Sequence, residues 1–136
     1  MRIEMALISG GAIGIAKDYG PSGELLAISF SVPSSGQRLV SVRLPGNVQE
    51  VENVFLSRLK RRPTKSSAER IRAQAARTGW KLVQDWVEVQ MALIKMKQAE
   101  FLQVFLPYVW DGRQTFYESL KENNFRLLGQ GKPEKK

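Results

Sequence analysis

Residues 66–97, SSAERIRAQAARTGWKLVQDWVEVQMALIKMK, carry the pattern of one long amphipathic helix. Apolar side chains recur there every three to four positions, which is the spacing of a helix face. From Trp80 onward two such stripes run side by side, so we expect a central helix that packs on a sheet with one flank and on later helices with the other. Ser66-x-x-Glu69 is a capping box and predicts where this helix begins.

The residues before this helix predict an antiparallel sheet. Ser9-Gly10-Gly11-Ala12 is typical of a hairpin, because glycine supplies the positive φ that tight hairpin turns need. In the last strand, alternation places Val40, Val42 and Leu44 on the buried face and Arg43 on the wet face. The expected strands are residues 3–8, 12–16, 24–32 and 37–44, with a turn at Ser34-Ser35-Gly36.

Three further helices are expected around the long one, and one of them is a short aromatic helix that begins at Phe101 and ends near Pro107. Pro45-Gly46 ends the sheet, Asn47 is a candidate N-cap, and residues 48–61 then have helical spacing of apolar side chains. Thr115-x-x-Glu118 is a second capping box that opens a C-terminal helix. The predicted class is therefore α+β: one domain over residues 1–128, with a four-stranded antiparallel sheet (1–45) covered by a helical layer (47–128). Residues 129–136 are expected to form a flexible polar tail.

The net charge of +8 comes from one segment, residues 58–81. That segment holds nine basic residues and one acid, whereas the rest of the chain has twelve basic and twelve acidic residues. Clustered cations where two helices meet can follow a phosphate backbone, because each neutralised phosphate releases counterions. We therefore predict that these side chains contact nucleic acid or another acidic partner. They are Arg58, Lys60, Arg61, Arg62, Lys65, Arg70, Arg72, Arg77 and Lys81.

The plainer interpretation of this segment is a solvated helix face that only confers solubility. The near absence of acids in it favours binding. The aromatic residues also have two interpretations, as core side chains or as binding side chains. Nine of the twelve lie from Trp80 onward. At helical spacing most of them should be core, but Trp110 and Tyr117 flank the Asp111-Gly112 turn. These two are the candidates for stacking on bases.

The composition argues against catalysis. The chain has no cysteine and no histidine, which removes thiolate nucleophiles, Ser-His-Asp triads and the usual zinc sites. Asp85 and Glu88 share a helix face, but no further acid joins them at the spacing of a magnesium site. We expect no enzyme activity, no catalytic or metal-binding residues and no cofactor. No apolar run is long enough to span a membrane, and the N-terminus has no signal-peptide pattern.

One pattern in the second half resembles small proteins encoded by phages and prophages. It consists of Trp80-x-Leu82-x3-Trp86-x3-Gln90, then residues 104–108 (VFLPY), then Asp111-Gly112-x2-Thr115-x-Tyr117-Glu118. The resemblance covers roughly residues 66–120. It implies a phage or prophage setting and the cytoplasm of a bacterial host, and it transfers no site residue.

The leading hypothesis is a non-enzymatic phage-type accessory protein that binds nucleic acid, of either strandedness, through the basic helix junction. The alternative is a small phage protein that inhibits or modulates a host machine, such as RNA polymerase or a defence complex. In that case the same basic surface would dock on an acidic protein surface. A third alternative is an assembly subunit, which stable self-association would reveal.

Overall fold

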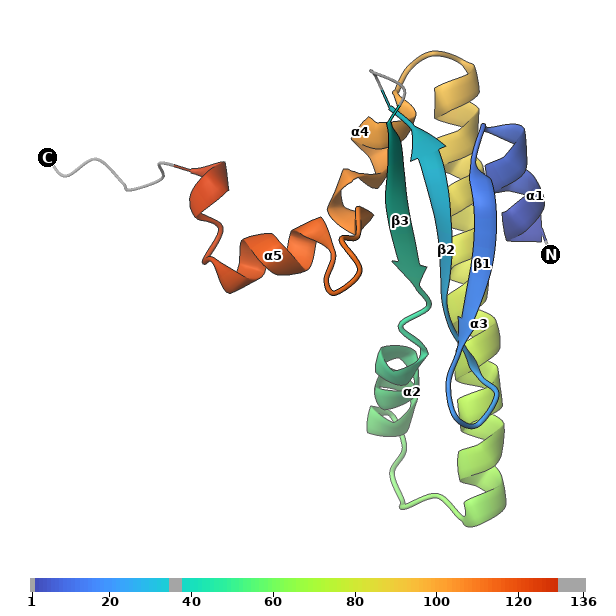
Figure 1. Cartoon of the computed structure of the whole chain (residues 1–136). Coiled ribbons are helices and arrows are strands. Elements are labelled where there is room, and N and C mark those ends of the chain that lie inside the picture. Colours follow the sequence, from blue (N-terminus) through green and yellow to red (C-terminus); the bar gives the residue numbers. More distant parts are fainter. Residues whose placement is uncertain (1, 35–37, 130–136) are drawn as a thin grey trace, which may run out of the picture.

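The computed structural model describes residues 2–34 and 38–129 and has the expected α+β class. A three-stranded sheet lies against one long helix, α3, and the C-terminal helices extend to one side (Figure 1). In chain order the elements are α1 (Arg2–Ser9), β1 (Ile13–Tyr19), β2 (Leu25–Pro33), β3 (Leu39–Pro45), α2 (Val48–Ser57), α3 (Lys65–Lys95), α4 (Phe101–Phe105), η2 (Leu106–Tyr108), α5 (Phe116–Glu122) and η3 (Arg126–Leu128).

The prediction of a strand over residues 3–8 is wrong, because these residues form helix α1. The described chain therefore has three strands, in the order β1-β2-β3, rather than four. A short apolar run does not separate strand from helix, and here Ile3 and Leu7 are buried one helical turn apart. The expected hairpin at Gly10-Gly11 is wrong for the same reason, since this segment links α1 to β1.

The other three predicted strands are present, and β3 has the alternating burial predicted for it. Strands β2 and β3 pair antiparallel, with Phe30 opposite Val42 and Ile28 opposite Leu44, and these four side chains are buried. Arg43 lies on the other face, as predicted, where its Nε is 3.1 Å from Oδ2 of Asp18. The predicted turn at residues 34–36 falls mostly outside the described residues, as does the predicted tail after Gly129.

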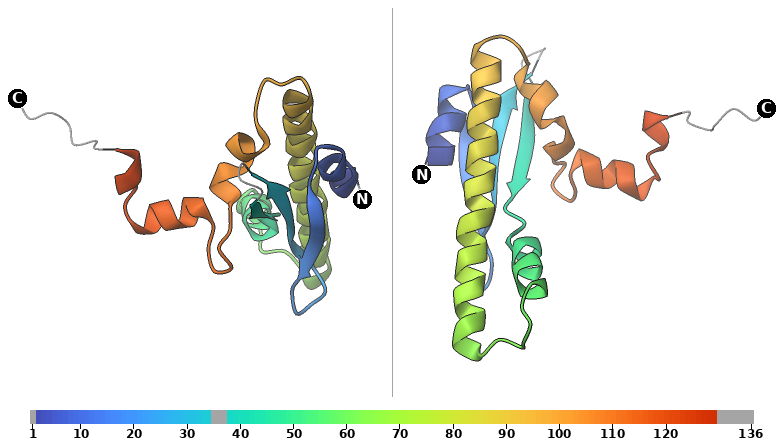
Figure 2. Two further views of the ribbon diagram at one scale, coloured as in Figure 1. Left: turned by 45° about the horizontal axis from the view of Figure 1, so that its top comes forward. Right: turned by 180° about the vertical axis from the view of Figure 1, so that it is seen from behind.

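The core lies between the sheet and α3. Figure 2 shows α3 running along the whole sheet, with α1 beside it. The stripe of α3 that contains Val87 and Met91 is buried, whereas Leu82 and Val89 on the other stripe are exposed, so the later helices cover less of α3 than expected. Where α4 packs on β2 and α3, the core is closed by a cluster of aromatic rings with edge-to-face contacts. Its members are Phe30, Trp86, Phe101, Phe105 and Tyr108.

The ends of the helices differ from the sequence expectation at α2 and α3. Thr64 caps α3, since its hydroxyl accepts a hydrogen bond from the Ser67 N–H at 3.1 Å, so the predicted cap at Ser66 is wrong. Helix α2 ends at Ser57 instead of residue 61. Asn47 occupies the N-cap position of α2 but in a left-handed conformation, without a capping side-chain bond. The Thr115–Glu118 capping box is confirmed.

Two glycines set how closely α2 approaches α3. A Cβ on Gly79 would lie 3.0 Å from the carbonyl oxygen of Gly46, and a Cβ on Gly46 would lie 2.5 Å from the Trp80 ring. The chain entering α2 therefore crosses directly over α3 at a point where no side chain fits. None of the helices in the described part of the chain is long and apolar enough to cross a membrane.

We expect Gly46→Ala to lower the free energy of unfolding by about 1–3 kcal/mol, because the new methyl group overpacks a site bounded by a rigid indole ring. The matched control is Gly20→Ala, where the added methyl would meet only the movable carboxylate end of Glu24. Urea denaturation of both variants measures the difference. Equal stability of the two variants would contradict the close crossing.

Candidate nucleic-acid interface

The structure gathers most of the predicted basic residues around one hollow, which we call the basic junction. It lies between the end of α2 and the start of α3 and has a volume of about 910 Å³. Six of the nine predicted cations line it, and all six are exposed. They are Arg58, Lys60, Arg61, Arg62, Arg70 and Arg77.

Apolar side chains lie between these cations. Phe55 and Leu59 come from α2 and the chain after it, Pro63 from the link, and Ile71 from α3. Because α2 ends at Ser57, residues 58–63 are free of the helix and pass around the open end of the hollow. The basic junction thus combines a cationic rim with an apolar floor.

The cations of the basic junction are not neutralised by the protein. No acid among the described residues forms an ion pair with any of the six. Arg77 donates from Nη2 to the side-chain oxygen of Gln74 at 2.7 Å, and both residues line the hollow. The charges of the six cations therefore remain available to an anionic ligand.

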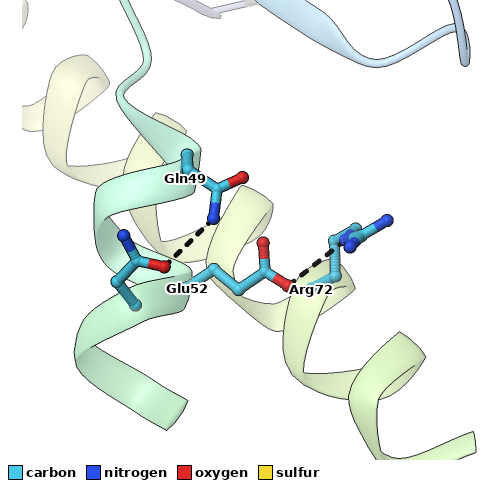
Figure 3. Close-up of polar contacts among 4 residues, drawn as sticks. Gln49, Glu52 and Arg72 are labelled. Atoms are coloured by element: carbon cyan, nitrogen blue, oxygen red, sulfur yellow. Dashed lines mark hydrogen bonds and ion pairs between the residues drawn. The ribbon is translucent and has the colours of Figure 1, made fainter. Parts of the chain in front are cut away.

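The remaining three predicted cations lie outside the hollow. Arg72 points to α2, where its Nε is 3.3 Å from Oε2 of the buried Glu52, and Figure 3 shows the two side chains meeting between the helices. Lys81 pairs with Asp85 at 3.0 Å along α3. Lys65 is the first residue of α3 and is exposed. Arg72 therefore links α2 and α3, and without it the buried Glu52 carboxylate would lose its ion-pair partner.

The two predicted stacking residues, Trp110 and Tyr117, line a second hollow, of about 560 Å³. We call it the aromatic pocket. Sequence reasoning missed Arg43, Arg113 and Lys121, which line it with them. For Arg113 and Lys121, their position among the aromatic residues of 108–121 is the signal that could have indicated them, whereas nothing in the sequence near Arg43 does so. Tyr108, Pro45, Asn47, Pro107, Thr115 and Glu118 complete the lining.

The turn beside the aromatic pocket is held by Asp111. Its carboxylate accepts hydrogen bonds from the backbone N–H groups of Gln114, at 2.9 Å, and Arg113, at 2.8 Å. These backbone bonds lower the pKa of Asp111 below its ordinary value, because they stabilise the charged form. The turn that follows Trp110 is therefore pinned by a carboxylate that stays ionised at neutral pH.

Both acids noted on α3 are paired with basic side chains. Asp85 is bound by Lys81, and Oε2 of Glu88 lies 3.0 Å from a guanidinium nitrogen of Arg2. Within residues 2–34 and 38–129, no group of three acidic side chains could hold a metal ion. Comparisons with protein-family models, with curated proteins and with solved structures found no match to this chain.

Proposed function

We propose that this protein is a non-enzymatic accessory protein of phage type that binds nucleic acid at the basic junction. The observation that carries the proposal is the set of six exposed cations around one hollow, none of them paired with a described acid. Phosphate backbones bind such sites through charge and counterion release, without a need for base contacts. The proposal therefore includes no sequence-specific readout.

The arrangement supports a polyanion better than a single anion. The six cations come from three parts of the chain: the end of α2 with the link, the first turns of α3, and Arg77 further along α3. A row of phosphates can contact cations at several separate points, whereas one small anion would leave most of them unpaired. Each contact adds to the salt dependence of binding.

The test is a salt titration with labelled single- and double-stranded oligonucleotides. We expect the logarithm of the binding constant to fall linearly with the logarithm of salt concentration. Dissociation constants near physiological salt should be well below ~100 µM, the weak limit of non-specific binding. If no oligonucleotide binds more tightly than that limit, the proposal is wrong.

The apolar floor of the basic junction favours a second candidate function, which is docking on an acidic protein surface. Leu59 is 42% exposed there, and an apolar side chain of a partner could cover it. The protein would then act as a modulator of a host machine. Affinity capture from a host lysate, with and without nuclease, separates the two candidates. A partner that persists after nuclease treatment supports protein docking, and one that disappears supports nucleic acid.

A further inference from the structure

We propose that the aromatic pocket holds an unstacked base, and that the nucleic acid bound by this protein is therefore single-stranded. This inference rests on the proposed function and adds the class of nucleic acid to it. The pocket lies beside the edge strand β3, where the segment after η2 pairs with the sheet.

The walls of the aromatic pocket are built on paired backbone. The Trp110 N–H donates to the carbonyl oxygen of Ser41 on β3 at 2.9 Å, and the Phe116 N–H donates to that of Val109 at 2.7 Å. Trp110 and Thr115 also form a β-bridge. These bonds hold the backbone that carries the half-buried indole of Trp110 and leads into the helix of Tyr117, whose ring is half-exposed, and both rings line the hollow.

Cations surround these rings. The Arg43 guanidinium carbon lies 5.6 Å from the centre of the Trp110 ring, and Arg113 and Lys121 line the pocket without an ion pair to any described acid. The one acid in the wall, Glu118, already accepts the Thr115 N–H at 2.7 Å. Aromatic faces with adjacent cations are the recognition chemistry of a nucleotide: the rings stack on the base and the cations bind its phosphates.

Aromatic rings in the wall of the pocket favour single strands. Bases in a duplex are stacked on their neighbours, and a side wall of tyrosine and tryptophan can receive a base only after it has left the stack. A volume of about 560 Å³ lies within the range of roughly 300–1,000 Å³ for small-ligand sites, so a single base with its sugar can enter.

The aromatic pocket and the basic junction lie at opposite ends of α2. Asn47, just before α2, lines the pocket, and Arg58, just after α2, lines the junction. A helix of ten residues is about 15 Å long. One strand covers that distance with about four to five nucleotides, even at the roughly 3.4 Å spacing of a stacked strand. A short single strand is therefore long enough to reach from one end of α2 to the other.

The experiment compares two probes on the full chain: oligothymidylate of about 16 nucleotides, near the upper site size of single-strand binding folds, and the same oligomer paired with oligoadenylate. We expect the single strand to bind at least about tenfold more tightly and to quench tryptophan emission, because the base stacks on Trp110. The Trp110→Phe variant should keep most of the affinity and lose most of the quenching.

Two sets of variants assign the effect to the pocket. Tyr117→Ala should weaken single-strand binding by about 5- to 150-fold, the range for one stacked base, and leave duplex binding unchanged. The Arg113→Gln/Lys121→Gln pair should weaken it about tenfold near 0.15 M salt. The matched control is Tyr19→Ala, since Tyr19 is an exposed tyrosine on β1 outside both sites and should have no effect.

The results separate this inference from the proposed function. If single strand and duplex bind equally and Tyr117→Ala binds like the wild type, the single-strand inference is overturned while binding at the basic junction stands. If neither probe binds more tightly than ~100 µM, the proposed function itself is wrong. Thermal melting of each variant shows whether it is folded. If Tyr117→Ala is unfolded, the affinity of the Arg113→Gln/Lys121→Gln variant for the single strand tests the inference instead.

Discussion

Replacing Arg61, Arg62 and Arg77 together with glutamine is expected to weaken nucleic-acid binding by about 50- to 150-fold near 0.15 M salt. All three line the basic junction, and none is paired with a described acid. In a plot of the logarithm of the binding constant against the logarithm of salt concentration, each phosphate contact adds about 0.7 to the slope for single strands or 0.9 for duplex DNA. At this salt concentration that is roughly 0.6–0.7 of a decade in affinity per contact, and three contacts give the expected loss.

The salt titration provides a second, independent readout of the same variant. Its log–log slope should be smaller than that of the wild type by about two to three. The control removes three other exposed cations outside both sites, as Arg38→Gln/Lys95→Gln/Arg126→Gln, which gives the same change in net charge. An equal loss of affinity in the two triple variants would mean that only net charge matters and would contradict a defined site.

Replacing Phe105 with alanine is expected to lower the free energy of unfolding by about 3–5 kcal/mol. Phe105 is fully buried, and its ring centre lies 5.3 Å from that of Phe30 and 5.5 Å from that of Trp86, in edge-to-face geometry. The ring joins β2 and α3 to the short helix α4. Its loss removes the apolar transfer energy of the side chain and leaves a cavity between these elements.

Urea denaturation measures this effect, with Leu106→Ala as the control from the next position in the chain. Leu106 is 43% exposed, so its truncation should cost less than about 1 kcal/mol. A loss of stability as small for Phe105 as for Leu106 would show that the aromatic cluster does not close the core. A total stability of about 5–15 kcal/mol is usual for a domain, so the expected loss is a large part of it.

Much of this fold is visible in local patterns. Strands 13–19, 25–33 and 39–45 were expected within a few residues, because alternation over β3 leaves only one face for Val42 and Leu44. The long helix was expected because its helical spacing continues over 31 residues, whereas only short apolar runs are ambiguous between helix and strand. Residues 3–8 failed because a run of six apolar-rich residues suits both states, and only packing against α3 selects the helix.

The candidate site was predictable in charge but not in geometry. The sequence locates all the excess charge in residues 58–81, yet it does not show which cations turn toward one another. Arg72 was expected to bind a partner and instead pairs with Glu52, an acid on a different helix. Such a pairing depends on the crossing of α2 over α3, which no local spacing encodes. Arg43 lines the aromatic pocket because residues 109–116 lie beside β3, and this tertiary contact is likewise not encoded in local spacing.

The backbone crossing at Gly46 and Gly79 has a consequence for residues far from it. Helix α2 leaves that crossing as a rigid rod, and its far end carries one wall of the basic junction. A small tilt at the crossing becomes a larger displacement at Arg58, because displacement grows with distance from the pivot. The width of the basic junction therefore depends on two residues without side chains, at the opposite end of α2.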